Sequence, residues 1–482
     1  MRILETYLEA NRCATREYSR EPLQVEGQLP TDISGTLYRN GNGRFEHHGV
    51  VYKHLFDGDG MVSAFRFEGG RLLYSNRYVQ TWEFEAEEKA GRMLFRSFGT
   101  NAPGGFLKNA LRVRFKNAAN TSIRYHGGKL LALWEGGLPH EIDPETLETK
   151  SRYHYEGALL NPYSFLDRQI NPEMPFSAHP KIQPDSGEMY NFGTLAGVQQ
   201  RLMLYRVNPD GQAIVVDAVP MPGVTFTHDF ILTAGNKLVF FFTPVQFELW
   251  KAFLGYQSPV ESIRVRKDKP TSILLYDNGQ KETFETDFGF VFHFANGFET
   301  AEGLVVVDAL TMPDFPDANM SDANGASSLE APAGKLTRYT INRETKEVQK
   351  TVLSHCPVEL PYINQTRVGK PYQYLWCIGD PVGVRRPLLH SILKIDTHSG
   401  HTVVNDLYPN LPGEPVFIPR NTPADEDDGW LVFMVFDPEK IQTSLHICDA
   451  ATLHTIGIAA LPHNTPIGFH GTWVNYPGLQ PG

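Results

Sequence analysis

Four histidines occur in short apolar or aromatic stretches that are spread over most of the 482-residue chain: His179, His228, His293 and His470. One histidine in such a stretch is usually a core residue that is hydrogen-bonded to the backbone. Several neutral imidazoles together are ligands that zinc, copper, iron and nickel accept. Structural zinc sites usually take closely spaced ligands, often with cysteine. These histidines are far apart and no cysteine accompanies them, so the fold would have to assemble any metal site.

Three glutamates have comparable surroundings: Glu135, Glu359 and Glu414. A metal-binding histidine normally donates its other ring N–H to a carboxylate or a carbonyl, so three glutamates could orient three of the four histidines. Such pairing would also explain how the carboxylates tolerate burial. The sequence leaves open which glutamate orients which histidine. The seven polar positions follow one another at intervals of 44, 49, 65, 66, 55 and 56 residues.

Repeated hairpin signals indicate the elements that must position these side chains. Six segments share a short β run, then Asp or Asn, then a polar turn and another β run, and a seventh, looser one contains Gly-Gly. Asp, Asn and Gly favour tight hairpins because they tolerate left-handed dihedral angles and cap their own turn. The segments are residues 65–72, 141–146, 205–211, 275–279, 340–345, 394–400 and 447–452.

Seven hairpins in a chain with few helical patterns predict an all-β, seven-bladed β-propeller. The first strand of each propeller blade lines the central axis, so one polar residue per blade can point at a common centre. We therefore expect each of the seven polar residues to lie in a β run that starts a blade. A pair of β-sandwiches is the alternative, but sandwiches have no such convergence point. The last blade should be closed by N-terminal strands near residues 35–39 and 61–78.

Length and composition set the remaining limits. We expect an irregular lead-in over residues 1–30, one propeller domain over 31–482, and a surface loop at 314–334. A net charge of −11 argues against a nucleic-acid partner. We expect no signal peptide, and the absence of a long apolar run predicts no membrane-spanning helix. The four scattered cysteines fit a cytoplasmic setting.

Two apolar segments interrupt the strand pattern. Residues 106–115 and 240–256 are short-helix candidates, rich in apolar residues. Each could pack beneath a long loop, or each could contact a membrane surface while the protein is otherwise cytoplasmic. The sequence leaves both readings open.

Eight motifs lie along almost the whole chain, from about residue 35 to 473: residues 38–41, 55–61, 116–121, 131–137, 177–180, 226–229, 414–420 and 469–471. Together they resemble the motifs of the carotenoid cleavage oxygenase family. The resemblance implies a seven-bladed propeller with non-haem Fe(II) on its axis and a cap of loops and short helices over the metal-bearing face. By position, the four histidines match the family's iron ligands, and Glu135, Glu359 and Glu414 match the carboxylates behind them. Leu360 departs from the family, which often has an aromatic residue there.

The resemblance further implies that O2 and an apolar polyene are the partners, and that one C=C bond is cleaved to two carbonyl products. We favour an apocarotenoid substrate and a retinal-forming cleavage. Trp134 and Phe226 are expected to stack on the polyene near the metal, and no catalytic residue is expected beyond the metal site. Two alternatives remain. One is a lignostilbene or hydroxystilbene substrate whose phenol is handled by Tyr78 and Lys116. The other is a metal-free propeller that acts as a binding scaffold.

Overall fold

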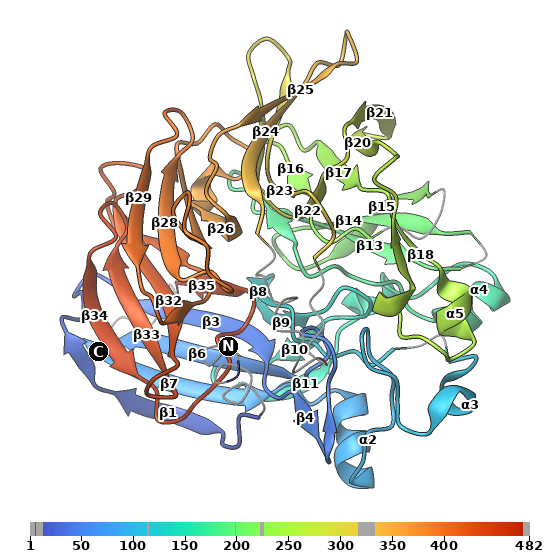
Figure 1. Ribbon diagram of the computed structural model, residues 1–482, viewed down its shortest axis with the longest axis horizontal. Helices are drawn as coiled ribbons and strands as arrows, with labels where there is room; N and C mark the ends of the chain where they lie inside the picture. Colours follow the sequence, from blue (N-terminus) through green and yellow to red (C-terminus); the bar gives the residue numbers. More distant parts are fainter. Residues whose placement is uncertain are drawn as a thin grey trace.

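The computed structural model describes residues 5, 13–112, 115–197, 199–221, 226–316 and 333–475. Within these residues the strands form seven sheets of four to six strands, arranged around a common axis, and two additional two-stranded hairpins (Figure 1). The protein is thus an all-β, seven-bladed propeller, as the sequence predicted. Blades one to five each take four strands that follow one another in the chain, interrupted only in blade three.

Each blade runs from an inner strand at the axis to an outer strand at the rim. Blade one comprises β8 (Ser122–His126), β9 (Lys129–Leu133), β10 (His140–Ile142) and β11 (Thr149–Arg152). Blade two comprises β12 (Lys181–Ile182), β13 (Met189–Leu195), β14 (Arg201–Val207) and β15 (Ala213–Pro220). Blade three comprises β16 (Ile231–Leu232), β17 (Leu238–Phe242), β20 (Thr271–Asp277) and β21 (Gln280–Thr286). Blade four comprises β22 (Phe290–Glu299), β23 (Val305–Met312), β24 (Lys335–Ile341) and β25 (Val348–Val352).

The last three blades follow the same order. Blade five comprises β26 (Val358–Ile363), β27 (Tyr374–Gly379), β28 (Ser391–Asp396) and β29 (Thr402–Asp406). Blade six comprises β30 (Leu411–Pro412), β31 (Val416–Pro419), β32 (Gly429–Asp437), β33 (Gln442–Asp449), β34 (Thr455–Ala460) and β2 (Val25–Gly27). Blade seven comprises β35 (Gly471–Val474), β3 (Gly35–Asn42), β6 (Gly60–Glu68), β7 (Arg71–Tyr78) and β1 (Tyr18–Leu23).

All seven predicted hairpins connect the third and fourth strands of a blade, counted from the axis. The ring is closed by β35, which pairs with β3 from Thr36↔Val474 to Arg39↔Gly471. Both predictions are confirmed. Residues 18–27 form β1 and β2, although they lie in the stretch that we expected to be irregular. These strands are short and largely exposed at the rim, so they lack the alternating apolar pattern that identifies a strand in a sequence.

The core is a set of hydrophobic clusters at the seams between neighbouring blades. Blades one and two share a cluster, as do two and three, three and four, four and five, and seven and one. The largest cluster joins blades five, six and seven. Central strands supply most of these residues, as in β32, where eight of nine residues are buried. Because both faces of a central strand pack against a neighbouring blade, such strands read as continuous apolar runs.

Long connections carry the helices and the two small hairpins. The hairpins are β4 (Glu46–His47) with β5 (Val50–Val51), and β18 (Val245–Phe247) with β19 (Ile263–Val265); the helices are α2 (Trp82–Ala90), α3 (Gly105–Asn109), α4 (Phe165–Ile170) and α5 (Leu249–Phe253). Thr81 caps the start of helix α2, since its Oγ1 accepts a hydrogen bond from the Phe84 N–H at 3.1 Å, and Gly91 caps the end of the helix.

The two predicted short helices are shorter than expected. Of residues 106–115, only the part up to Asn109 is helical, and residues 113 and 114 lie outside the described residues. Of residues 240–256, the first three end the buried strand β17, and helix α5 covers five residues. Consecutive aromatic residues suit a buried strand as well as a helix, which explains the error. The loop predicted at 314–334 falls mostly outside the described residues.

Candidate metal centre

The four histidines lie at the axis ends of four different blades. His179, His228 and His470 directly precede or closely approach the inner strands β12, β16 and β35. His293 lies inside β22, where the register with β23 shifts between Val291 and Phe294. Such a bulge bends a strand and re-aims a side chain. The inner strands therefore carry all four imidazoles to one place.

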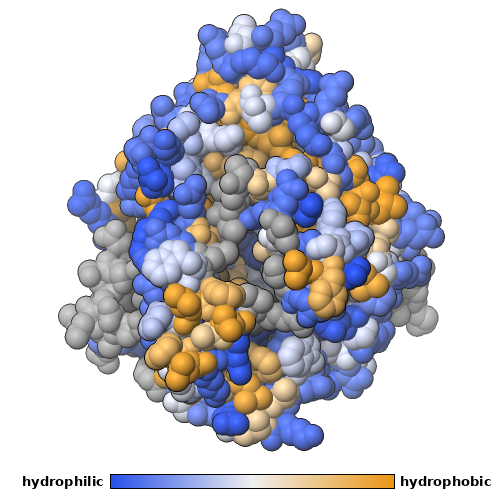
Figure 2. Space-filling view, turned by 90° about the vertical axis from the view of Figure 1, so that its right-hand side faces the viewer, coloured by the Kyte–Doolittle hydropathy of each residue, from blue (hydrophilic) through white to orange (hydrophobic). Residues whose placement is uncertain are grey.

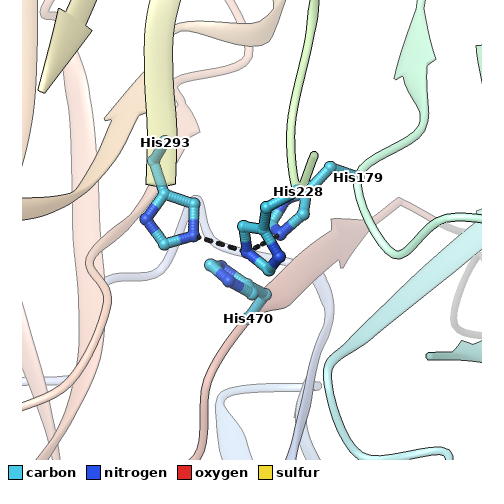
Figure 3. Close-up of side chains that lie close together, drawn as sticks. All are labelled: His179, His228, His293 and His470. Carbon is cyan, nitrogen blue, oxygen red and sulfur yellow. Dashed lines mark hydrogen bonds between the residues drawn. The ribbon is translucent and has the colours of Figure 1, made fainter. Parts of the chain in front are cut away.

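The ring nitrogens of these histidines converge (Figure 3). One ligand atom from each residue lies within 4.8 Å of the others. The Nε2 atoms of His179 and His228 are 2.9 Å apart, and those of His228 and His293 are 3.2 Å apart. All four residues are buried, with 8 or 9% of each residue exposed. The structure thus brings together the four histidines that the sequence singled out.

Carboxylates contact three of the four imidazoles on the opposite ring nitrogen. Nδ1 of His293 lies 2.6 Å from Glu359 Oε2, and Nδ1 of His470 lies 2.8 Å from Glu414 Oε1. The third pair is His228 Nδ1 and Glu135 Oε1, at 3.1 Å. The pairing that the sequence left open is therefore settled by geometry.

Glu135 does not lie where we expected it. It occupies the turn between β9 and β10, so the expectation that each polar residue lies in a strand that starts a blade was wrong for this position. Only His293 and Glu359 lie within inner strands, whereas the other four residues lie in the segments beside them: His179, His228, Glu414 and His470. Its Oε2 also accepts a hydrogen bond from Ser177 Oγ at 3.2 Å. Glu135 therefore reaches across from blade one toward the segment that carries His179.

This donor set fits a metal ion. The carboxylates at Nδ1 of His293 and His470 fix the proton there, so the Nε2 lone pairs of these two residues point inward. Glu135 lies near Nδ1 of His228 and favours the same tautomer. Lone pairs about 3 Å apart repel unless a cation lies between them. Two nitrogen ligands about 2.1 Å from a metal are about 3.0 Å apart at right angles and about 3.4 Å apart at tetrahedral angles. The observed separations suit ligands at right angles, which leaves positions for further ligands.

The protonation states of His179 and His470 support metal binding by neutral imidazoles. Burial, reinforced by the neighbouring histidines, holds the pKa of His179 well below its ordinary value. Burial also lowers the pKa of His470 to about 4. Burial disfavours the charged form of His293 too, but the adjacent Glu359 outweighs it and raises the pKa of this residue. Burial would raise the pKa of Glu414, but His470 and Arg39 keep it below the ordinary value.

Arg39 is a further residue of the site, to which the sequence assigned no role. Its Nη1 donates to Glu414 Oε2 at 2.8 Å and to the Glu414 carbonyl at 3.0 Å. Its Nη2 donates to the carbonyl oxygens of Ile467 and Phe469. The guanidinium is 1% exposed and thus holds both Glu414 and the segment that leads to His470. The only signal was a charged residue within the motif at 38–41.

Asp229 connects three of the histidine-bearing segments and was also missed. Its Oδ1 lies 2.7 Å from Lys181 Nζ, two residues after His179. Its Oδ2 accepts a hydrogen bond from the Phe294 N–H at 3.0 Å, directly after His293. Asp229 itself follows His228 and is 4% exposed. A polar cavity on the axis adjoins the histidines and is lined in part by Asp229, Lys181, Arg124 and Asn296.

An aromatic cluster lies beside the histidines. The Phe226 ring lies 6.2 Å from the His228 ring and 5.5 Å from Phe292. Long connections add Phe56, Phe247 and Phe315, which contact Phe226 or Phe292. Trp134 packs against its own loop, since a Cβ on Gly136 would come within 2.7 Å of the indole. Phe226 is thus close to the four-histidine group, and Trp134 adjoins Glu135.

Tyr78 and Lys116 make other contacts than those expected for a phenol substrate. The Tyr78 hydroxyl lies 2.9 and 2.8 Å from the carbonyl oxygens of Ala14 and Gly43. Lys116 is fully buried, and its Nζ lies 2.5 Å from Asp59 and 2.7 Å from Glu87. Both side chains are therefore committed to structural contacts. These contacts argue against a role of the two residues toward a phenol, and their partners could not be foreseen because they are distant in sequence.

A buried four-histidine group with supporting carboxylates, on the axis of a propeller, is typical of a metal-dependent enzyme. Over residues 11–475 the chain matches the family model described as retinal pigment epithelial membrane protein. It is 33% identical to apocarotenoid-15,15'-oxygenase of Synechocystis sp., covering 97% of this chain and 96% of the relative. It is 30% identical to resveratrol cleavage oxygenase 1 of Aspergillus fumigatus, covering 94 and 92%. The crystal structure of cobalt-substituted Synechocystis ACO superimposes with a TM-score of 0.90 at 32% identity, covering 98 and 99%.

The chain belongs to this family, the carotenoid cleavage oxygenases, and it is an oxygenase. The resemblance seen in the sequence is thereby confirmed. The alternative of a metal-free scaffold is set aside, because the relatives over almost the whole chain are oxygenases. Within the described part of the chain, no helix combines the length and the apolar character needed to cross a bilayer.

Proposed function

We propose that the protein is a non-haem Fe(II) dioxygenase that cleaves one C=C bond of an apocarotenoid, with retinal as a product. Both atoms of O2 enter the products, so that R–CH=CH–R′ and O2 give two carbonyl compounds. The observation that carries this proposal is the inward convergence of four imidazoles, three of them with a carboxylate on the outer nitrogen. Iron bound there would supply O2 activation.

The donor set supports iron over a structural metal. His179, His228, His293 and His470 would hold the ion, and Glu135, Glu359 and Glu414 would fix the tautomers of three of them. The distances between the Nε2 atoms suit ligands at right angles, which leaves coordination positions of the ion open. Structural zinc sites are closed and tetrahedral. Imidazole ligands are compatible with iron. The family to which the chain belongs supplies the further argument for Fe(II).

The surroundings of the centre support an apolar, conjugated substrate. Phe226 and Phe292 lie next to His228, and the Phe292 ring is 5.4 Å from the His228 ring. A polyene would be held by stacking and by exclusion of water, since aromatic faces offer large apolar contact areas. Phe226 is our first candidate for this contact, and Trp134 is the second because it adjoins Glu135. The named activity of the Synechocystis relative favours an apocarotenoid.

A hydroxystilbene is the second candidate substrate. The observation in its favour is the similarity to a resveratrol cleavage oxygenase. Tyr78 and Lys116 cannot carry this hypothesis, because the carbonyl oxygens and carboxylates described above occupy them. A phenol would have to be recognised by other groups.

Contact with a membrane would give access to a lipid-dissolved polyene. Phe106 stacks on Tyr256 with ring centroids 4.8 Å apart, and the Leu111 N–H donates to the Phe253 carbonyl at 2.8 Å. The segments around α3 and α5 thus form one surface, and Figure 2 shows hydrophobic residues near a hollow on this side of the molecule. Its exposed large apolar residues are Phe106, Leu107, Leu111, Trp250, Phe253, Leu254 and Tyr256. Such a patch suits insertion into a lipid surface.

The substrate is tested by incubating iron-loaded protein with apocarotenals and, separately, with hydroxystilbenes under O2. We expect two aldehydes from an apocarotenal, identified by mass, with one 18O in each when 18O2 is supplied. Turnover of hydroxystilbenes alone would favour the second candidate. Failure with both substrates by protein that has retained iron would contradict the proposed function.

The membrane contact has its own test. We expect the protein to float with lipid vesicles, and Leu107→Glu to reduce the bound fraction several-fold. Val404→Glu on β29, which is 39% exposed, serves as a matched control at the rim of another blade. Equal flotation of both variants would contradict a contact through this patch.

A further inference from the structure

A second group of potential metal ligands lies where the β4–β5 hairpin meets helix α2, elements that Figure 1 places side by side. His47 and His48 come from the hairpin and Glu88 from the helix, and one ligand atom of each lies within 4.8 Å of the others. Glu88 Oε1 is 3.7 Å from His47 Nδ1 and 4.0 Å from His48 Nε2. This group is independent of the four-histidine centre.

The orientation of His47 points to a cation at this position. Its side chain is 1% exposed, and its Nε2 lies 3.8 Å from Glu87 Oε2 without a hydrogen-bond partner. A proton on Nε2 is attracted by this carboxylate, which leaves the Nδ1 lone pair directed at the Glu88 carboxylate. A lone pair and a carboxylate repel each other unless a cation separates them. In metal sites, a histidine that binds the ion with one ring nitrogen usually donates the N–H of the other to a carboxylate.

We propose that His47 Nδ1, His48 Nε2 and the Glu88 carboxylate bind a divalent ion of the zinc class. Two imidazoles and one carboxylate are donors that such ions accept, with a remaining position for water. Ligands at tetrahedral angles are about 3.4 Å apart, so the observed 3.7 and 4.0 Å require small side-chain movements. His48 and Glu88 are 34 and 44% exposed, so an ion can reach the site from solvent.

Arg44 limits the affinity of this site. Its Nη1 lies 2.8 Å from Glu88 Oε1, so a bound ion must compete with the guanidinium or use the other carboxylate oxygen. Arg44 keeps a second partner, since its Nε lies 2.7 Å from Asp59 Oδ2. We therefore expect micromolar affinity, weaker than that of a closed structural zinc site. A bound ion would fasten the hairpin to α2 and so stabilise the folded protein.

The test is calorimetric titration of Zn2+ into tag-free, iron-loaded protein, with the iron content measured before and after. We expect one equivalent of zinc to bind without loss of iron, and the melting temperature to rise until a chelator is added. His48→Ala should lose this equivalent and the shift, and Glu88→Gln should weaken binding at least about tenfold. His398→Ala, which removes an exposed histidine of another turn, should behave as the original protein.

Two outcomes would overturn the proposal. One is the absence of zinc binding beyond the exchange of iron. The other is zinc binding of the same stoichiometry and affinity in His48→Ala and in His398→Ala. His48 lies outside the four-histidine centre, so iron content and oxygenase turnover should be equal in both variants, which shows that each is folded.

Discussion

Two buried polar clusters of this protein differ in where their positive charge comes from. On the axis, four imidazoles converge on a point and three carboxylates lie behind them, and no cationic side chain of the cluster occupies that point. Beside α2, Lys116 Nζ occupies the corresponding place, with Asp59, Glu87 and the Tyr52 hydroxyl at 2.5, 2.7 and 3.1 Å. The chain supplies the cation of the second cluster itself, whereas the first is a donor set that fits a metal ion.

The difference shows how a structural charge cluster can be told from a metal centre. Burial opposes the charged form of Lys116, but Asp59 and its other neighbours outweigh it and raise the pKa of the ammonium above its ordinary value. The same attraction, against burial, lowers the pKa of Asp59. These groups stabilise one another's charged forms. The axial histidines His179 and His470 have lowered pKa values instead, and thus stay neutral and free to bind a metal.

The largest effect is expected from His293→Ala. The variant removes one inward nitrogen and leaves Glu359 without its partner, so we expect loss of iron retention and of detectable turnover. The propeller should persist, because its stability derives from the seams between blades. Iron analysis, turnover assays and far-ultraviolet circular dichroism provide the measurements. Turnover at the original rate would show that His293 is not a ligand.

Lys116→Met should have the largest effect on stability. It leaves Asp59 and Glu87 buried without a cation, and breaking a buried ion pair in this way costs about 3–5 kcal/mol. We expect the free energy of unfolding, measured with denaturant, to fall by this amount, while any protein that remains folded still binds iron. If Lys116→Met instead lost cleavage of a hydroxystilbene without losing stability, Lys116 would belong to the substrate site.

Glu414→Gln should weaken iron retention about 10–100-fold, the usual range for a carboxylate behind a ligand. Glu414 is 4% exposed and also neutralises Arg39, so its loss affects both the His470 imidazole and a buried guanidinium. Glu135→Gln is the comparison, and we expect a smaller effect because this carboxylate is 29% exposed and lies 3.1 Å from its histidine. Iron dissociation into a chelator measures both. Equal rates for Glu414→Gln and the original protein would contradict this role.

Asp229→Asn should have the smallest effect. It removes the ion pair with Lys181, and loss of one such contact costs about 1 kcal/mol, which corresponds to about fivefold faster iron loss. Lys181→Met should act similarly, and the double variant should add little, because both changes remove the same contact. Additive effects of the two changes would show that Asp229 and Lys181 act separately.

The fold could be predicted from the sequence because its signals are local. Asp, Asn and Gly mark each hairpin, and apolar runs mark the central strands. The four histidines were recognisable for a related reason, since each is a polar residue in an apolar segment next to an inner strand. Glu359 and Glu414 shared this setting, and their partners followed once the blades were placed.

The remaining features depend on contacts between distant segments. Arg39 reaches Glu414 across 375 positions, and no local pattern announces this pair. Asp229 appears in the sequence merely as the residue after a histidine, and its bond to Phe294 exists only in the assembled ring. Glu135 was recognised as a candidate carboxylate, but it was predicted to lie in a strand and lies in a turn. A turn can direct a side chain toward the axis as well as a strand can. The helix at residues 240–256 was misjudged because aromatic runs suit both structures.

Ring closure has a consequence for biosynthesis. His470 directly precedes β35, the strand that joins the seventh blade to β3 near the other end of the chain. A nascent polypeptide that has not yet released this segment from the ribosome lacks the fourth imidazole, as well as the strand that completes the propeller. Neither the closed ring nor the complete set of four imidazoles can therefore form before this segment has left the ribosome.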